Sequence, residues 1–250
     1  MTALTVGVTT AKQPECKRGL AVNFAASLAR HSALSARVCV VDADPFTLDV
    51  STRLAVAGPT LEDFVRPRMP NVGRLARFHS PEFTVIPSDD EPIARIHYAI
   101  DRAIDPLRDA FDVVVIDLPG GPSGPGRAVG NRLEKLDWLL LAVTPEPDAI
   151  AAAAHFVEMF ETARMKGDVG DVRLAVVCTG DESTAMFEPE EVEAILGVAT
   201  VGRVPQLWGR AAPNLGFGPA LAIPELDDAV YDVLMAFRLG RDHQHQFATL

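Results

Sequence analysis

The 250-residue sequence has few cysteines, few aromatic residues and no long apolar run. Its three cysteines, Cys16, Cys39 and Cys178, are widely spaced and outside any CxxC pattern. This argues against a disulfide framework or a zinc site and favours a reducing compartment. No apolar run reaches the roughly 18 residues that cross a bilayer, and the N-terminus lacks the features of a signal peptide. We therefore expect a cytoplasmic protein.

An excess of positive charge is also lacking, because the formal net charge is -11. Such a balance argues against nonspecific DNA binding through overall charge. One segment, Arg66 to Arg77, is nevertheless locally basic. A solvated loop is the simpler interpretation of this segment, and an interface with an acidic partner or DNA is the alternative.

Apolar, β-branched runs alternate with segments of helical periodicity along most of the chain. This alternation predicts an α/β fold with a mostly parallel central sheet and helices on both faces. We expect one domain over residues 1–240 and a loose polar tail over 241–250, with the helix at 93–110 interrupted before Pro106. The predicted strands are 4–9, 37–41, 83–87, 113–116, 138–143, 173–178 and 199–204, and the other helices are 20–31, 148–166, 188–196 and 227–239.

The loop after the first predicted strand is the most informative segment, with the sequence KQPECKR at 12–18. It resembles, in position, the deviant Walker A loop KGGxGK[ST] of the ParA/MinD family of P-loop ATPases. Further similarities to that family follow in family order, and two of them favour its MinD-like side: LDV at 48–50 and VIPS at 85–88. The others are AVNFAASLA at 21–29, VVDADP at 40–45, FDVVVIDLPG at 111–120, VTPEP at 143–147 and VGRVP at 201–205. The resemblance implies a three-layer, P-loop NTPase-like domain.

The resemblance also implies a role for several individual residues. Lys17 takes the place of the P-loop lysine, and Lys12 that of the signature lysine, which reaches the partner's nucleotide across a dimer. Asp44 corresponds to the switch I residue that positions the attacking water, and Asp117 to the Walker B aspartate that supports Mg²⁺. If the site acts on a nucleotide, Asp44 and Lys12 are the candidate catalytic residues, and the nucleotide-binding residues are Lys12, Lys17, Arg18, Gly19, Asp42 and Asp117.

The loop departs from the family pattern where phosphate binding depends on it. Gln13, Pro14 and Cys16 replace the glycines that let backbone N–H groups converge on phosphates. Arg18 replaces the hydroxyl ligand of Mg²⁺. Each lost charge-assisted hydrogen bond is worth roughly 1.5–3 kcal/mol, so losing two weakens binding about 10²–10⁴-fold. The sequence therefore predicts no metal site, and any ATP or ADP would bind without Mg²⁺.

Two uses of the remaining charges stay open. They can form a residual ATPase site, or they can be inherited strand-end residues, with Asp42 pairing with Lys17 or Arg18 in a nucleotide-free cluster. After the sixth predicted strand, Cys178 and Thr179 stand where the family often has an asparagine that reads adenine. Neither side chain offers the paired donor and acceptor of an amide.

These observations predict a MinD/ParA-like pseudo-ATPase or very weak ATPase. By resemblance, it would be a dimeric scaffold or regulator in cell division, DNA partitioning or spatial positioning. We expect a protein partner and a homodimer that uses Lys12, Glu15 and Arg18 as interface charges. The sequence gives no strong support for direct membrane or DNA binding. The alternative is a working ATP-dependent switch with an unusual loop, and an ATP-dependent ligase relative ranks last because those enzymes keep the glycine-rich loop.

Overall fold

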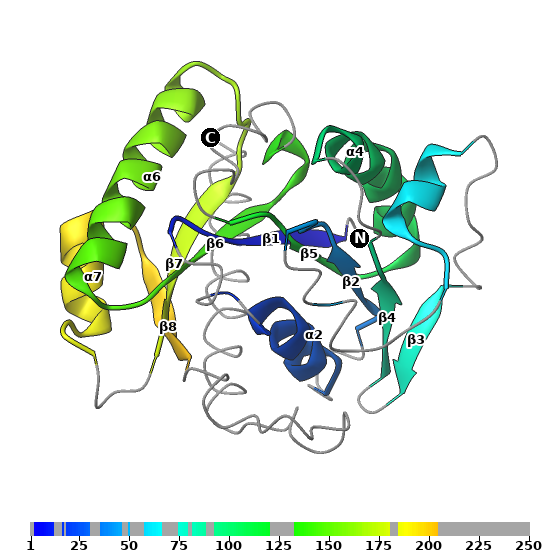
Figure 1. Ribbon diagram of the computed structural model, residues 1–250, viewed down its shortest axis with the longest axis horizontal. Coiled ribbons are helices and arrows are strands. Elements are labelled where there is room, and N and C mark those ends of the chain that lie inside the picture. The colour runs from blue at the N-terminus through cyan, green and yellow to red at the C-terminus, as the bar shows by residue number, and fades with distance from the viewer. Residues whose placement is uncertain are drawn as a thin grey trace, which may run out of the picture.

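The computed structural model describes residues 3–12, 17, 19–30, 36–46, 50, 58–66, 75–79, 82–88, 93–120, 133–180 and 185–204. Strands and helices alternate through these ranges (Figure 1). The strands are β1 (Leu4–Thr10), β2 (Val38–Asp42), β3 (Ala76–His79), β4 (Glu82–Ile86), β5 (Val113–Asp117), β6 (Trp138–Val143), β7 (Arg173–Thr179) and β8 (Thr200–Val204). The helices are α2 (Leu20–Arg30), α4 (Ile93–Ala110), α6 (Pro147–Met165) and α7 (Pro189–Leu196), with 3-10 turns η1 (Leu61–Val65) and η4 (Leu133–Lys135).

The strands form a single sheet in the order β3-β4-β2-β5-β1-β6-β7-β8. All neighbouring pairs are parallel except β3 and β4, which are antiparallel. The predicted α/β class with a mostly parallel sheet is confirmed. Because β2, β5, β1 and β6 lie side by side at the centre and run in the same direction, their carboxyl ends meet at one edge.

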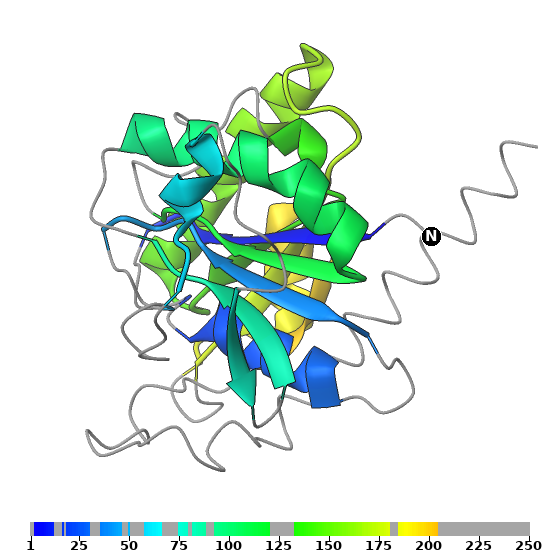
Figure 2. The ribbon, with the colours of Figure 1, turned by 90° about the vertical axis from the view of Figure 1, so that its right-hand side faces the viewer.

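Helices cover both faces of the sheet (Figure 2). Alternate residues of β5 show this division, since Val113 and Val115 belong to the core cluster that contains α2, while Val114 and Ile116 belong to the cluster on the other face, which contains α4. The central strands β2, β5 and β6 are almost entirely apolar because they bury both faces. The three-layer arrangement predicted from the sequence is therefore present.

Strand β3 corrects the interpretation of the basic segment as a loop. Ala76 and Arg77 lie in this strand, which pairs with β4 through Ala76↔Val85 and Arg77↔Thr84. The sequence ARFH has no apolar run that would predict a buried strand. The extended conformation of β3 therefore depends on pairing with the neighbouring edge of β4. At the other end of the segment, Arg66 forms an exposed ion pair with Asp63, at 2.9 Å.

The predicted interruption before Pro106 was wrong, because α4 continues from Ile93 to Ala110 with Pro106 inside it. A proline removes one backbone hydrogen bond from a helix. Ile104 and Leu107, on either side of it, are each only 1% exposed, so burial of these side chains holds the helix together.

Three further expectations have a more limited outcome. The helix predicted at 227–239 and the tail at 241–250 lie outside the described residues, and the limits of the predicted domain stay a prediction. Among the helices that the structure describes, none is long and apolar enough to cross a membrane.

Candidate functional site

The candidate site lies at the carboxyl edge of the sheet, where β2 and β5 end side by side. The register pairs Asp42 with Asp117, which places the last residues of both strands next to each other. The backbone N–H of Ala43 donates to the carbonyl of Asp117 at 3.0 Å, so the pairing continues one residue beyond β2. Asp44 follows directly. The sequence placed Asp42, Asp44 and Asp117 at strand ends, and parallel pairing brings them together.

Lys17 reaches into this edge from the segment between β1 and α2. Its Nζ lies 2.6 Å from Oδ1 of Asp117, with hydrogen-bond geometry, and 2.7 Å from Oδ2 of Asp44 as an ion pair. The side chains of Lys17, Asp117 and Asp44 are 1%, 4% and 1% exposed, respectively. One ammonium group therefore bridges two carboxylates from different strand ends, shielded from solvent.

Burial and charge act in opposite directions on the Lys17 ammonium. Burial alone would lower the pKa of Lys17, but Asp117 and Asp44 outweigh it and hold the pKa above its ordinary value of 10.5. Lys17 is therefore a cation at neutral pH.

Burial has the largest effect on the pKa of Asp117. It raises the pKa of Asp117 to about 7, although Lys17 lowers it, and the neighbouring Asp42 and Asp44 add to the increase. One ammonium among three carboxyl groups does not fully offset their mutual repulsion at this position.

Backbone N–H groups fix the orientation of the carboxylates. Oδ1 of Asp42 accepts the N–H of Asp44 at 3.3 Å, and Oδ1 of Asp44 accepts the N–H of Phe46 at 3.0 Å. Asp44 thus uses one oxygen to hold its own loop and the other to hold Lys17. Short side chains that bond to the backbone two residues ahead are typical of such turns.

Gly120 is a site residue that sequence reasoning noticed only as part of a motif. A Cβ at this position would lie 2.5 Å from Cγ2 of Thr10 and 3.5 Å from Cε of Lys17. Nearby, Oγ1 of Thr9 donates to the carbonyl of Pro119 at 2.8 Å, which draws the loop after β5 onto the end of β1. The glycine therefore makes room for the methyl group of Thr10, and the Lys17 side chain passes at ordinary contact distance. The Pro-Gly pair directly after a strand is the signal that could have revealed it.

Two predicted site residues have other partners. Lys12 is 41% exposed, and its Nζ lies 3.0 Å from Oδ2 of Asp148 in the first turn of α6. Gly19 has a positive φ of 73°, and its carbonyl accepts a hydrogen bond from Nδ2 of Asn23 at 2.7 Å, so it introduces α2. Arg18 lies outside the described residues, as do Gln13, Pro14, Glu15 and Cys16.

Cys178, one of the two residues in the place of the family's asparagine, is a buried free thiol at the end of β7. Burial raises the pKa of Cys178 to about 11, so it is a neutral thiol near pH 7. Thr179 follows it, also buried, and its Oγ1 has no hydrogen-bond partner among the described residues. Neither residue supplies the paired donor and acceptor of an amide.

Solved structures with this arrangement of strands and helices are numerous. MinD of Aquifex aeolicus superimposes with a TM-score of 0.66 at 18% sequence identity, over 93% of this chain and 97% of that one. A ParA family ATPase of Chlorobium tepidum gives 0.68 at 17% identity, over 92% and 98% of the two chains. An ATP complex of a Cyanothece McdA variant gives 0.68 at 16% identity, over 94% and 96%. The chain has the MinD/ParA fold.

The similarity lies in the fold, at sequence identities too low to carry a function. No protein-family model matches the sequence, and none of the curated proteins matches it. Within the MinD/ParA fold, the expected resemblance in architecture is confirmed. The chemistry of this chain has to be argued from its own residues. Lys17, Asp42, Asp44 and Asp117 come together, whereas Lys12 pairs with Asp148 of α6.

Proposed function

We propose that this chain is a pseudo-ATPase or very weak ATPase with the MinD/ParA fold. It acts as a dimeric scaffold or regulator in cell division, DNA partitioning or another process of spatial positioning. The observation that carries the proposal is the position of Lys17, whose Nζ lies within 2.7 Å of carboxylate oxygens of both Asp44 and Asp117.

A phosphate-binding lysine has to present its ammonium to the β- and γ-phosphates. Here that ammonium would have to leave two buried carboxylates, which would then lack their counter-ion. Breaking a buried ion pair in this way costs about 3–5 kcal/mol. The sequence of the loop adds to the cost, because Gln13, Pro14 and Cys16 stand where glycines would let backbone N–H groups compensate.

The proposed dimer would use the charged residues around the loop. Lys12, Glu15 and Arg18 are the candidates, and Lys12 engages Asp148 within the same protomer. The Lys12–Asp148 pair is exposed, and such pairs contribute only about 0–1 kcal/mol, so Lys12 can exchange Asp148 for a carboxylate of a second copy at little cost. A protein partner is supported by a similar structure, the MinC:MinD complex of Aquifex aeolicus.

Isothermal titration calorimetry tests the nucleotide part of the proposal. We expect no heat of binding for ATP or ADP, with or without Mg²⁺. The matched control restores the family loop through Gln13→Gly, Pro14→Gly, Cys16→Gly and Arg18→Thr, and we expect this variant to gain Mg²⁺-dependent binding. Micromolar ATP binding by the wild-type chain would contradict the expected loss of nucleotide affinity and would favour the working switch.

Sedimentation velocity tests the scaffold part. We expect a dimer without nucleotide and a shift toward monomer in Lys12→Ala, whereas Lys166→Ala, at the far end of α6, leaves the distribution unchanged. A wild-type chain that stays monomeric at high concentration contradicts the dimer.

A second candidate function is a working ATP-dependent switch. It is favoured by the retention of Asp44 and Asp117 at the strand ends and by similar structures that hold nucleotides, namely the McdA–ATP complex and a MinD with Mg-ADP from Pyrococcus horikoshii. The same titration separates the two candidates, because a switch has to bind ATP more tightly than the loop-altered site allows.

A further inference from the structure

Two carboxylate oxygens from different strand ends converge on one point of the candidate site. Oδ2 of Asp44 and Oδ1 of Asp117 are both within hydrogen-bonding distance of a single atom, Nζ of Lys17. Convergent carboxylates normally hold a metal cation, and magnesium is the ion that the MinD with Mg-ADP carries. In this chain the point of convergence is taken by an ammonium group.

The residues present do not fit Mg²⁺ while Lys17 keeps this position. Magnesium requires nearly octahedral oxygen ligation at about 2.0–2.1 Å and retains several waters. The two oxygens are already engaged by Nζ, and all three side chains are at most 4% exposed. Among the residues that the structure describes, no three His, Cys, Asp or Glu side chains form a group that could hold a metal ion.

We propose that Lys17 is the resident cation of this site and replaces the divalent metal. Its ammonium ties the end of β2 to the end of β5 and to the segment before α2, so this edge keeps its arrangement without metal or nucleotide. The inference rests on the proposed function, since a scaffold that does not cycle through ATP needs a site that already holds a cation. It adds the regulatory consequence that the state of the site does not depend on Mg²⁺.

The neighbouring residues are suited to an ammonium at this point. A lysine ammonium is a compact charge with three donors, so it can contact carboxylates that approach from different directions. Asp44 is held in place by the N–H of Phe46, which its Oδ1 accepts at 3.0 Å. The geometry is built from three separate segments, and all of them meet at Nζ.

A divalent cation and the Lys17 ammonium would therefore compete for the same oxygens. If Lys17 is replaced by methionine, the aspartates keep their strand-end positions but lose the cation between them. The variant Lys17→Met should then gain a site for Mn²⁺, which prefers carboxylate ligands and can be followed by electron paramagnetic resonance.

The experiment titrates Mn²⁺, without nucleotide, into the full chain as wild type, Lys17→Met and Lys135→Met. Lys135 also bridges two aspartates, but these are 38% and 70% exposed, so Lys135→Met reports weak surface binding by this acidic chain. We expect Lys17→Met to bind Mn²⁺ about tenfold or more tightly than the other two proteins. Saturating Mn²⁺ should raise its Tm by about 5 °C and leave the others unchanged. Adding Asp117→Asn to Lys17→Met should remove the gain.

Two results would overturn the inference: wild-type protein that binds Mn²⁺ as tightly as Lys17→Met, or a Lys17→Met variant that gains no binding. If Lys17→Met is unfolded in EDTA, refolding on addition of Mn²⁺ supports the inference, and failure of both it and Lys17→Gln to refold with Mn²⁺ overturns it. The proposed function fails on a different measurement, ATP binding by the wild-type chain, so the two can be told apart.

Discussion

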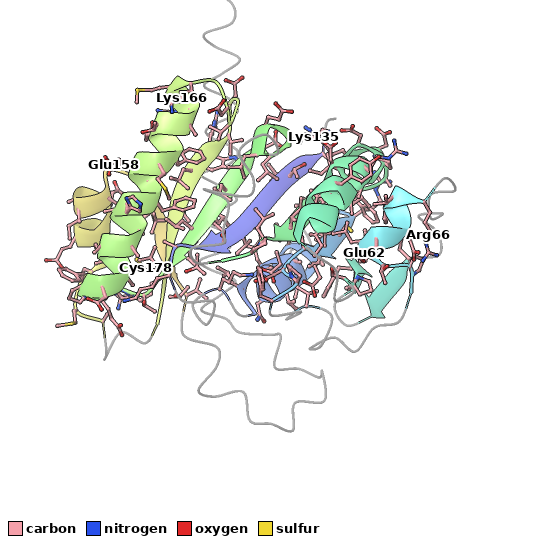
Figure 3. The ribbon with its side chains drawn as sticks, turned by 45° about the horizontal axis from the view of Figure 1, so that its top comes forward. Glu62, Arg66, Lys135, Glu158, Lys166 and Cys178 are labelled. Atoms are coloured by element: carbon pink, nitrogen blue, oxygen red, sulfur yellow. The ribbon has the colours of Figure 1, made fainter. Side chains whose placement is uncertain are left out.

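Two lysines of this protein are each shared between two aspartates, at opposite ends of the sheet. Lys17 contacts Asp44 and Asp117 at the carboxyl edge. Lys135 contacts Asp101 at 3.3 Å and Asp105 at 3.0 Å, at the edge where β6 begins. Figure 3 shows Lys135 toward the end of the strands away from Cys178, which lies near the carboxyl end of β7.

The two clusters have the same composition but differ in how far their side chains are exposed to solvent. The Lys17 side chain is 1% exposed, whereas Lys135 is 26% exposed and Asp105 is 70% exposed. In the exposed cluster water offsets most of the interaction, so the ion pairs contribute little to stability. In the buried cluster each charge depends on the others, because no water replaces a lost partner. The same residue types therefore contribute little to stability at one edge of the sheet and contribute strongly at the other.

The largest effect is expected when each lysine is removed. Lys17→Met should lower the free energy of unfolding by about 3–5 kcal/mol, because it leaves buried carboxylates without a counter-ion. Lys135→Met should cost less than about 1 kcal/mol. Urea denaturation of both variants measures the difference. Equal losses would show that burial does not distinguish the clusters.

The next largest effect is the dependence of the free energy of unfolding on pH, which we expect to arise from Asp117. Its pKa is about 7 in the folded chain and about 3.8 in the unfolded chain, so between these values only the folded state holds the proton. The contribution is therefore present at low pH and is lost as the pH rises through about 7. We expect the free energy of unfolding to fall by roughly 2–3 kcal/mol between pH 5 and pH 8 on this account.

Asp117→Asn isolates this contribution, because the variant lacks the titrating group. Its stability should vary less over the same pH range, as measured by urea denaturation at each pH. Asp105→Asn, in the exposed cluster, should follow the wild-type profile. A flat wild-type profile between pH 5 and pH 8 would contradict the raised pKa of Asp117.

A smaller effect should follow from crowding the buried cluster. Gly120→Ala places a Cβ 2.5 Å from Cγ2 of Thr10, and overpacking of this kind costs about 1–2 kcal/mol. Thr10→Ser removes that methyl group, so the double variant Gly120→Ala with Thr10→Ser should regain most of the loss. Thermal unfolding of the single and double variants checks this, and a loss that Thr10→Ser does not relieve would point to a different cause.

The smallest effect is expected within the exposed cluster. Asp105→Asn should change the free energy of unfolding by about 0.5 kcal/mol or less, and adding salt to about 0.5 M should abolish the difference because salt screens exposed charges. Asp44→Asn serves as the comparison, since its buried ion pair should keep most of its contribution in salt. If both variants respond equally to salt, the carboxyl-edge cluster is more accessible to solvent than its burial implies.

Much of the fold could be predicted because it depends on local patterns. The apolar, β-branched runs of β1 and β5 indicate buried strands, and the structure pairs Asp42 with Asp117 at the ends of β2 and β5. Strand β3 escaped prediction because its conformation depends on β4, and α4 continues through Pro106 because burial outweighs one lost hydrogen bond. Neither feature is visible in local periodicity.

By itself, the sequence determined the layered α/β architecture and the carboxyl-edge position of Asp42, Asp44 and Asp117, since strand periodicity and parallel pairing fix both. It also places Gln13, Pro14 and Cys16 where the ParA/MinD loop that it resembles has glycines. Only the tertiary structure decided which carboxylates Lys17 and Lys12 pair with. Lys17 bridges Asp44 and Asp117 in the interior, and Lys12 pairs with Asp148 across 136 positions of sequence. The partner of each lysine depends on burial and on contacts between residues far apart in the sequence. No short segment of the sequence specifies either of these.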